Sequence, residues 1–243
     1  MTDLPSSARR WARTALRLLL PSTCALCGAG CDGVVCAGCQ GAYVLARTRC
    51  ARCANPLPDA VAMCGACLAA PPPFDATVVA VDYAAPLDQL VLQLKFGARL
   101  ALAPWCAAML RDAVLARPGL ALPDLLCPVP LGHGRLVERG FNQALEIARP
   151  LASALGVALH PTLLARTLDT AAQSGVAPSE RARNVRGAFA VADADLVAGR
   201  HVGLVDDVMT SGHTLGELAA TCKRFGAARV TNLVFARTPP HLD

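Results

Sequence analysis

The sequence lacks several patterns that identify common classes of protein. No uninterrupted apolar run approaches the roughly 18 residues that a membrane-spanning helix needs, although the mean hydropathy is +0.41. No GxxxxGK[ST] element is present, which excludes a P-loop nucleotide site. The N-terminal apolar run Leu18–Leu20 is too short for a signal peptide, and the small-residue cleavage pattern is missing. We therefore expect a cytoplasmic protein with no transmembrane segment.

What is present suffices for two structural units. The chain has 243 residues, of which 54% are hydrophobic, and this supplies a core for one α/β domain plus a small module. Four arginines precede the apolar run and predict an amphipathic helix over residues 1–20, with a helix at a membrane surface as the alternative. Pro71–Pro73 stiffens the chain and is expected to end a module over residues 21–72, so that the main domain covers 73–243.

Eight of the twelve cysteines form four CxxC pairs. The two-residue gap places both sulfurs of a pair on one side of a tight turn, as a tetrahedral zinc site requires. Disulfides are the alternative, but a reducing compartment disfavours them. Consecutive pairs are expected to share a metal, although the spacing also permits crossed pairing. The expected ligands of two structural zinc ions are Cys24, Cys27, Cys36 and Cys39 for one ion, and Cys50, Cys53, Cys64 and Cys67 for the other.

The excess of basic residues is only weak evidence that the protein binds nucleic acid. The net charge is +5, and residues 1–72 hold seven arginines against three aspartates. If the cysteines bind zinc as thiolates, each four-thiolate centre carries about two negative charges, which offsets this surplus. We expect any direct contact with DNA to be weak and salt-dependent.

In the main domain, apolar runs alternate with segments of helical periodicity. This alternation predicts an α/β fold with a parallel sheet, flanked by helices and joined by right-handed crossovers. The expected strands are 76–83, 125–129, 159–166, 201–206 and 229–236, and the expected helices are 86–96, 100–117, 141–155 and 214–225. Loop residues 131–143 and the polar run 167–179 are expected to carry chemistry rather than regular structure.

The stretch His201–Thr214 passes from an apolar strand over two carboxylates into a turn rich in hydroxyls and glycine, followed by a helix. The backbone N–H groups of such a turn and the positive end of the helix favour an anion, and Gly212 lets the backbone approach it. Asp206 and Asp207 would repel a phosphate but suit a neighbouring diol. Together these features predict a ribose 5-phosphate site; the alternative is a turn whose polar side chains only cap a helix. The expected ligand contacts along it are Val208, Met209, Thr210, Ser211, Gly212, His213 and Thr214.

From Leu204 to Thr214 the stretch resembles the signature of type I phosphoribosyltransferases, with departures at Gly203 and His213. Over residues 20–238 the ordered series of CxxC pairs, LKFG, PVPLxxxRLxERGFNQA, RTxxTxxQSGxxxxERxxNVRGAF and VDDVxTSGxT resembles the ComF family. Members of this family are competence-associated proteins that join an N-terminal zinc ribbon to a phosphoribosyltransferase domain.

The resemblance implies that the protein binds phosphoribosyl pyrophosphate with Mg²⁺ and acts in DNA uptake. Asp206 and Asp207 would hold the ribose hydroxyls, while Lys95, Arg135 and Arg139 would contact the pyrophosphate, and the 167–186 segment would close over the site. The acid pair and Arg139 are the residues expected to act in catalysis, toward an acceptor that the sequence does not identify. The alternative is a non-catalytic sugar-phosphate-binding adaptor that works through its zinc ribbons. Its partners would be single-stranded DNA or proteins of the uptake machinery.

Overall fold

The computed structural model describes residues 22–58, 61–167 and 187–239. The chain forms two compact units, Met1–Leu45 and Ala46–Asp243. The helix expected over residues 1–20 and nearly all of the 167–186 segment lie outside the described residues. Among the helices within them, none combines the length and the apolar character needed to cross a membrane.

The described part of the first unit is a small hairpin followed by a helix. Strands β1 (Ser22–Thr23) and β2 (Gly30–Cys31) pair antiparallel, and α2 spans Ala37–Tyr43. Cys36 is the N-cap of α2, and its side chain accepts a hydrogen bond from the backbone N–H of Cys39. Because a predicted zinc ligand caps this helix, metal binding would use the same turn as helix formation.

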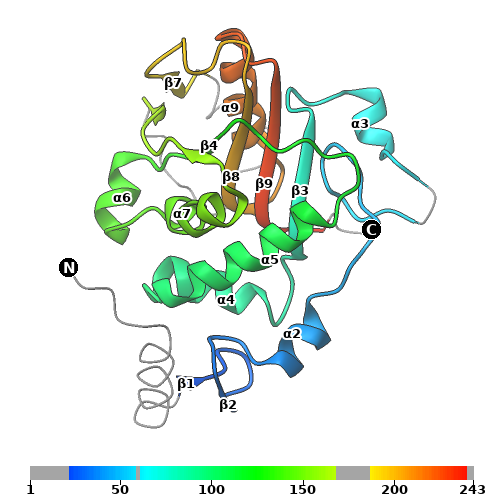
Figure 1. The fold of residues 1–243 in the computed structure, drawn as a ribbon, viewed down its shortest axis with the longest axis vertical. Coiled ribbons are helices and arrows are strands. Elements are labelled where there is room, and N and C mark those ends of the chain that lie inside the picture. Colours follow the sequence, from blue (N-terminus) through cyan, green and yellow to red (C-terminus); the bar gives the residue numbers. More distant parts are fainter. Residues whose placement is uncertain (1–21, 59–60, 168–186, 240–243) are drawn as a thin grey trace. The chain divides into compact units, whose positions relative to one another are not determined.

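The second unit is built on a five-stranded sheet in the order β3-β9-β8-β4-β5, and all four strand pairs are parallel (Figure 1). The strands are β3 (Ala76–Asp82), β4 (Leu125–Pro128), β5 (Ala158–Leu159), β8 (His201–Met209) and β9 (Arg229–Arg237). Strands β8 and β9 lie inside the sheet and are buried at most positions, as expected for strands covered on both faces. The parallel α/β fold predicted from the alternation of elements is confirmed.

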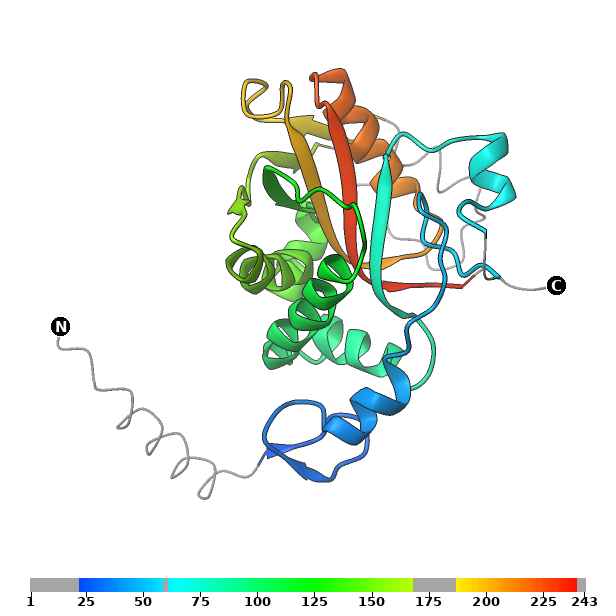
Figure 2. The same cartoon turned by 45° about the vertical axis from the view of Figure 1, so that its right-hand side comes forward.

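Helices cover both faces of this sheet. Helices α5 and α7 pack on one face, close to α4, and α9 packs on the other, an arrangement that Figure 2 shows from a second direction. The edge of Trp105 meets Phe235 at a ring-centroid distance of 5.8 Å, which joins α5 to β9. The helices are α4 (Asp88–Phe96), α5 (Ala103–Leu115), α6 (His133–Arg139), α7 (Gln143–Leu155) and α9 (His213–Arg224), with a 3₁₀ turn at Leu100–Leu102.

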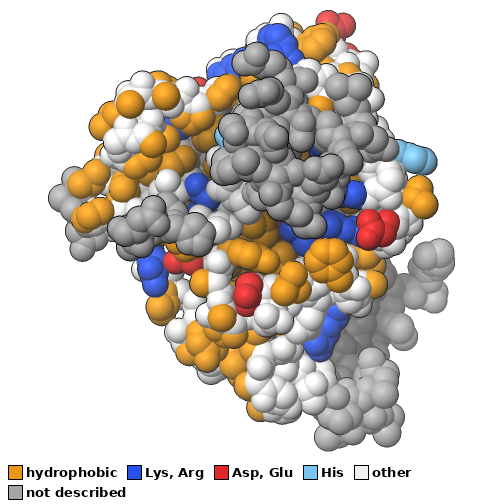
Figure 3. All heavy atoms as spheres, turned by 180° about the vertical axis from the view of Figure 1, so that it is seen from behind, with side chains coloured by type: hydrophobic (Ala, Val, Ile, Leu, Met, Phe, Trp, Pro, Cys, Tyr) orange, Lys and Arg blue, Asp and Glu red, His pale blue; other side chains and the backbone are white. Residues whose placement is uncertain are grey.

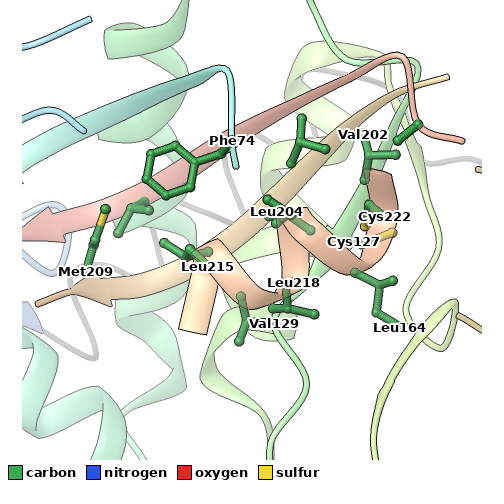
Figure 4. Packing of buried hydrophobic residues seen from close by; sticks show 14 of the residues in the cluster. Phe74, Cys127, Val129, Leu164, Val202, Leu204, Met209, Leu215, Leu218 and Cys222 are labelled. Carbon is green, nitrogen blue, oxygen red and sulfur yellow. The ribbon is translucent and has the colours of Figure 1, made fainter. Parts of the chain in front are cut away.

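The core beneath α9 holds the functional end of the sheet in place. Leu215 and Leu218 of α9 pack over Leu204 of β8, with Val129 nearby (Figure 4). All three leucines are fully buried, and each such side chain stabilises the fold by about 2 kcal/mol. Leu215 lies in the first turn of α9, so its packing anchors the start of that helix.

Three elements differ from the sequence-based expectation. Strand β8 continues to Met209, so both acids lie within it. The strand expected over 159–166 is divided: β5 joins the main sheet, whereas β6 (Leu164–Arg166) pairs antiparallel with β7 (Phe189–Val191). Pro161, which has no N–H to donate to a ladder, lies at the break. Within the expected loop 131–143, residues 133–139 form α6, which ends at Gly140 with φ +75°.

The second cysteine cluster belongs to the same compact unit as the sheet. Arg117 donates from one guanidinium nitrogen to the carbonyl of Ala51 and from another to that of Thr77, both at 2.7 Å. Arg49 pairs with Asp82 at 2.7 Å. The segment around this cluster, which includes helix α3 (Gly65–Ala69), is therefore tied to the edge strand β3 by buried polar contacts. The predicted limits at residues 20 and 72 stay predictions about folding domains.

Candidate functional site

Two clusters of four cysteines are present, one in each compact unit. In each cluster the four sulfur atoms lie within 4.8 Å of one another. The clusters join consecutive CxxC pairs, which decides between the sequential and crossed pairings that the spacing left open. All twelve cysteines are free thiols. Four sulfurs at such distances suit a tetrahedral metal centre, and both sites are consistent with structural zinc.

Backbone N–H groups point at the sulfurs and favour their thiolate forms. The N–H of Cys36 donates to Cys24 Sγ at 3.3 Å, and that of Cys64 to Cys50 Sγ at 3.4 Å. Burial raises the pKa of both acceptor thiols, but these and other backbone hydrogen bonds outweigh it and lower each pKa to about 6. Each cluster thus has one thiol that is ready to bind metal at neutral pH.

Asp207 lies almost completely buried near the C-terminal end of β8. Its Oδ2 atom is 2.6 Å from Lys95 Nζ, and its side chain is 4% exposed. The amide Nε2 of Gln143, at the start of α7, donates to Asp207 Oδ1 at 3.4 Å. The structure therefore brings the LKFG motif and the acid pair together, and the Lys95 ammonium forms an ion pair with Asp207. A contact between Lys95 and pyrophosphate stays a prediction.

Arg139 extends this cluster from the end of α6. Its guanidinium donates to Gln143 Oε1 at 3.0 Å and lies 5.2 Å from the ring centroid of Phe96. Gln143 and Phe96 were not among the predicted site residues, although both stand inside the quoted motifs, in RGFNQA and LKFG. Arg135 lies one helical turn before Arg139, which directs both toward one side of α6. No contact recorded within the described residues joins Arg135 to this cluster.

Asp206 is half-buried next to Asp207. Burial, followed by the negative charge of Asp207, raises the pKa of the Asp206 carboxyl well above its ordinary value. Its Oδ1 accepts a hydrogen bond from the backbone N–H of Asp207 at 2.9 Å. A carboxylate in this position gains from a hydroxyl donor or a cation placed beside it.

The predicted phosphate turn connects β8 to α9. Gly212 is the N-cap of α9 and has φ +81°, and an added Cβ would lie 2.5 Å from Cε of Met209. The positive φ therefore favours glycine, and the Met209 side chain would have to move to admit a Cβ. Since the N-cap residue has no side chain, α9 begins without a side-chain cap, and Ser211 Oγ instead contacts His213 Nδ1 at 3.1 Å. This favours a turn that offers its N–H groups to an anion over one whose hydroxyls only cap the helix.

Gly203, the departure from the type I signature, has a packing reason. A Cβ at this position would lie 2.5 Å from Leu126 Cδ2 and 2.8 Å from Pro123 Cγ. The side chains of Leu126 and Pro123 occupy the space that a branched residue would take. The departure is compensated within the core and leaves the turn unchanged.

Basic side chains gather near the middle of the face drawn in Figure 3, next to hydrophobic groups. Two of the seven arginines of residues 1–72 are already paired: Arg47 and Arg49 lie 3.2 Å and 2.7 Å from the carboxylate of Asp82. The side chain of Arg49 is also largely buried. These pairs reduce the positive surface available to a nucleic acid.

Comparison with known proteins agrees with these sites. A family model described as the double zinc ribbon domain matches residues 15–68, which include both cysteine clusters. The DNA utilization protein YhgH of Escherichia coli K12 is 38% identical over 91% of this chain and 99% of its own. Competence protein F of Haemophilus influenzae is 31% identical over 81% of this chain and 87% of its own. The chain belongs to the ComF family.

Solved structures that resemble this chain are more distant. The adenine phosphoribosyltransferase of Thermoanaerobacter pseudethanolicus shares 18% identity over 60% of this chain and 73% of that chain, with a TM-score of 0.35. The glutamine phosphoribosylpyrophosphate amidotransferase of B. subtilis shares 17% identity, with a TM-score of 0.37. The match to the amidotransferase includes 56% of this chain but only 26% of the amidotransferase chain.

Proposed function

We propose that this protein binds phosphoribosyl pyrophosphate, or another ribose 5-phosphate compound, together with Mg²⁺, and that it acts in the uptake of external DNA. The observation that carries the proposal is the order of groups at the end of β8: a buried acid pair, then a turn that leads into a helix without a side-chain cap. Acids suit the vicinal hydroxyls of ribose, and the turn suits the 5-phosphate.

The phosphate would bind to backbone N–H groups and hydroxyls from Thr210 to Thr214. Gly212 permits close approach of the ligand, and the first turn of α9 adds the positive end of its dipole. Each charge-assisted hydrogen bond to the phosphate contributes about 1.5–3 kcal/mol. The acids lie outside this turn, which keeps their negative charge from the phosphate.

The pyrophosphate would lie toward α4 and α6. Lys95 and Arg139 converge there through Asp207 and Gln143, and they supply two positive charges for a leaving group that gains negative charge as its bond to the sugar breaks. Arg135 is the third candidate from the same helix. For the ribose to reach Asp207, a hydroxyl must replace Lys95 Nζ, which frees the ammonium for the pyrophosphate.

The acid pair also fits Mg²⁺. Carboxylate oxygens are its preferred protein ligands, and a cation would offset the burial and the Asp207 charge that raise the pKa of Asp206. Asp206 and Asp207, together with ligand oxygens, would hold the ion. The ion would neutralise charge on the pyrophosphate, while Lys95 and Arg139 orient it.

The cellular role comes from the relatives. The printed names of two relatives refer to DNA utilization and competence, and we propose the same setting for this chain, in the cytoplasm. Because Arg47 and Arg49 are paired with Asp82, we expect contact with single-stranded DNA to be weak and salt-dependent. Recruitment by a protein of the uptake machinery then brings the sugar-phosphate site to the DNA.

The direct test uses calorimetry with phosphoribosyl pyrophosphate and Mg²⁺, followed by measurement of pyrophosphate release with and without single-stranded DNA. The wild type should bind, and Asp206→Asn should bind more weakly while remaining folded. Asp112→Asn is the matched control, because Asp112 is an exposed acid on α5 that pairs with its neighbour Arg111. Equal affinity in the wild type and Asp206→Asn rules out the proposed placement.

A second candidate is the non-catalytic adaptor, and one observation favours it. The ammonium of Lys95 already occupies Asp207, one member of the acid pair. In addition, no described residue is placed as a base that activates an acceptor. Binding of phosphoribosyl pyrophosphate without release of pyrophosphate, under every acceptor condition, identifies the adaptor. Release that depends on an added acceptor identifies the transferase.

A further inference from the structure

Arg237, the last residue of β9, connects the second cysteine cluster to the predicted phosphate turn. Its Nε donates to the carbonyl of Cys53, a predicted metal ligand, at 3.2 Å. One terminal nitrogen donates to the carbonyls of Met209 at 3.1 Å and Thr238 at 2.7 Å, and also to that of Thr210. A single side chain therefore joins the cysteine cluster to the first residue of the turn.

The two regions also share a cavity within the second unit. Its volume is about 390 Å³, and its wall includes Cys53 and Cys67 from the cluster, Ser211 and Gly212 from the turn, and Arg237 between them. The cavity contains neither Asp206 nor Asp207, so it lies on the cysteine side of the turn. The cluster thus forms part of the support beneath the phosphate turn.

Arg237 is buried without an acidic partner. Its exposed fraction is 7%, and no ion pair in the described part of the chain joins it to a carboxylate. A buried guanidinium normally needs a nearby negative charge, and a metal-loaded tetrathiolate centre supplies about two. Loading of the cluster therefore stabilises the arginine in the position from which it holds the turn.

We propose that Arg237 is a positioning residue through which metal in the second cysteine cluster orders the β8–α9 turn. The first cluster lies in the other compact unit and has no such link among the described residues. The two metal centres then differ in role: only the second controls the geometry of the turn. The consequence for ligand affinity rests on the proposed function, but the order of the turn does not.

Backbone amide hydrogen exchange of Ser211–His213 tests this in the zinc-loaded protein without any ligand. In Arg237→Lys the charge remains, but one amine cannot reach all four carbonyls, and we expect exchange at the turn to be about tenfold faster. Cys67→Ser, which removes a ligand of the second cluster, should give a similar increase together with the loss of one zinc.

Two controls make the result specific. Arg117→Lys weakens the contacts of a half-buried arginine that ties the cluster segment to the sheet through Ala51 and Thr77 but does not contact the turn. Cys39→Ser removes a ligand of the first cluster. Both should leave exchange at Ser211–His213 within about twofold of the wild type. Amides of Val230 and Leu233 in β9 report whether each variant remains folded.

The proposal is overturned if the turn amides of Arg237→Lys exchange as slowly as those of the wild type. It is also overturned if Arg117→Lys speeds their exchange as much as Arg237→Lys does. If Cys67→Ser unfolds the unit, Arg237→Lys and its control decide alone. Failure of the wild type to bind phosphoribosyl pyrophosphate refutes the proposed function. Because exchange is measured without ligand, it still decides the role of Arg237.

Discussion

Asp206 shows how a buried carboxyl in the proposed site costs stability. Burial and the charge of Asp207 raise the pKa of Asp206 in the folded protein, so the folded state favours its protonated form. The destabilisation is present where the folded carboxyl is ionised and disappears as pH falls toward the unfolded pKa of about 3.9.

Asp206→Asn should therefore raise the melting temperature at pH 8 and lose this advantage as the pH is lowered toward about 4. The same substitution weakens ligand binding, so stability and function change in opposite directions. Melting curves across this range check the prediction. Asp112→Asn, at an exposed position on α5, should show no comparable trend; a constant advantage for Asp206→Asn at every pH contradicts the electrostatic cause.

The Lys95–Asp207 pair is the second residue-scale feature. Removal of one partner leaves a buried charge uncompensated, so Lys95→Met should lower the free energy of unfolding by about 3 kcal/mol. The double variant Lys95→Met/Asp207→Asn should recover part of the loss. Urea denaturation measures both values.

Arg111→Met breaks the exposed pair between Arg111 and Asp112 and should change the free energy of unfolding by less than about 0.5 kcal/mol. A cost for Lys95→Met as small as that of this control shows that Asp207 is solvated in solution.

At the scale of elements, the β8–α9 turn depends on one glycine. Gly212→Ala should lower the free energy of unfolding by about 1–2 kcal/mol, because φ is positive there and the new Cβ meets Met209. Gly216→Ala, one turn into α9, meets only Pro73 at 3.8 Å and should be neutral or stabilising by up to about 1 kcal/mol. Thermal unfolding of the two variants compares them directly, and similar values for both contradict the strained-turn account.

At the scale of the whole molecule, the two cysteine clusters predict two zinc ions per chain and two different consequences of losing one. Cys24→Ser should leave the unfolding transition of residues 46–243 unchanged, because its cluster lies in the first unit. Cys50→Ser should lower that transition, because Cys50 belongs to the core cluster that includes Phe74 and Met209. Metal analysis together with calorimetric scans checks both. Purified protein without zinc, with its cysteines oxidised in pairs, contradicts the metal assignment.

The proposed role in DNA uptake concerns the whole chain. Loss of the gene should lower transformation by external DNA and leave basal nucleotide synthesis unchanged. A strain whose only copy carries Asp206→Asn with Cys24→Ser should show the same defect, whereas Asp112→Asn should transform normally. Normal transformation in the double variant, or tight single-strand binding that survives high salt, contradicts the proposed role.

The sequence by itself determined the features that depend on local order. Cysteine spacing predicted two four-cysteine metal sites but left their pairing open, the strand-helix alternation predicted the parallel sheet, and the motif series indicated the family. Each of these depends on residues within a few positions of one another, where backbone periodicity and turn chemistry are sufficient. The acid pair and the glycine turn could also be predicted from local sequence, since β8 and α9 are adjacent in the chain.

The tertiary structure decided which distant segments meet. It paired consecutive CxxC motifs, joined Lys95 and Gln143 to Asp207, placed Phe96 under Arg139, and connected Cys53 to Thr210 through Arg237. These contacts link separate elements, and they depend on strand order and helix packing, which no local pattern encodes. For the same reason α6 was expected as a loop: two glycines at its ends signal turns in sequence, and only packing of the chain around the site shows that a helix lies between them.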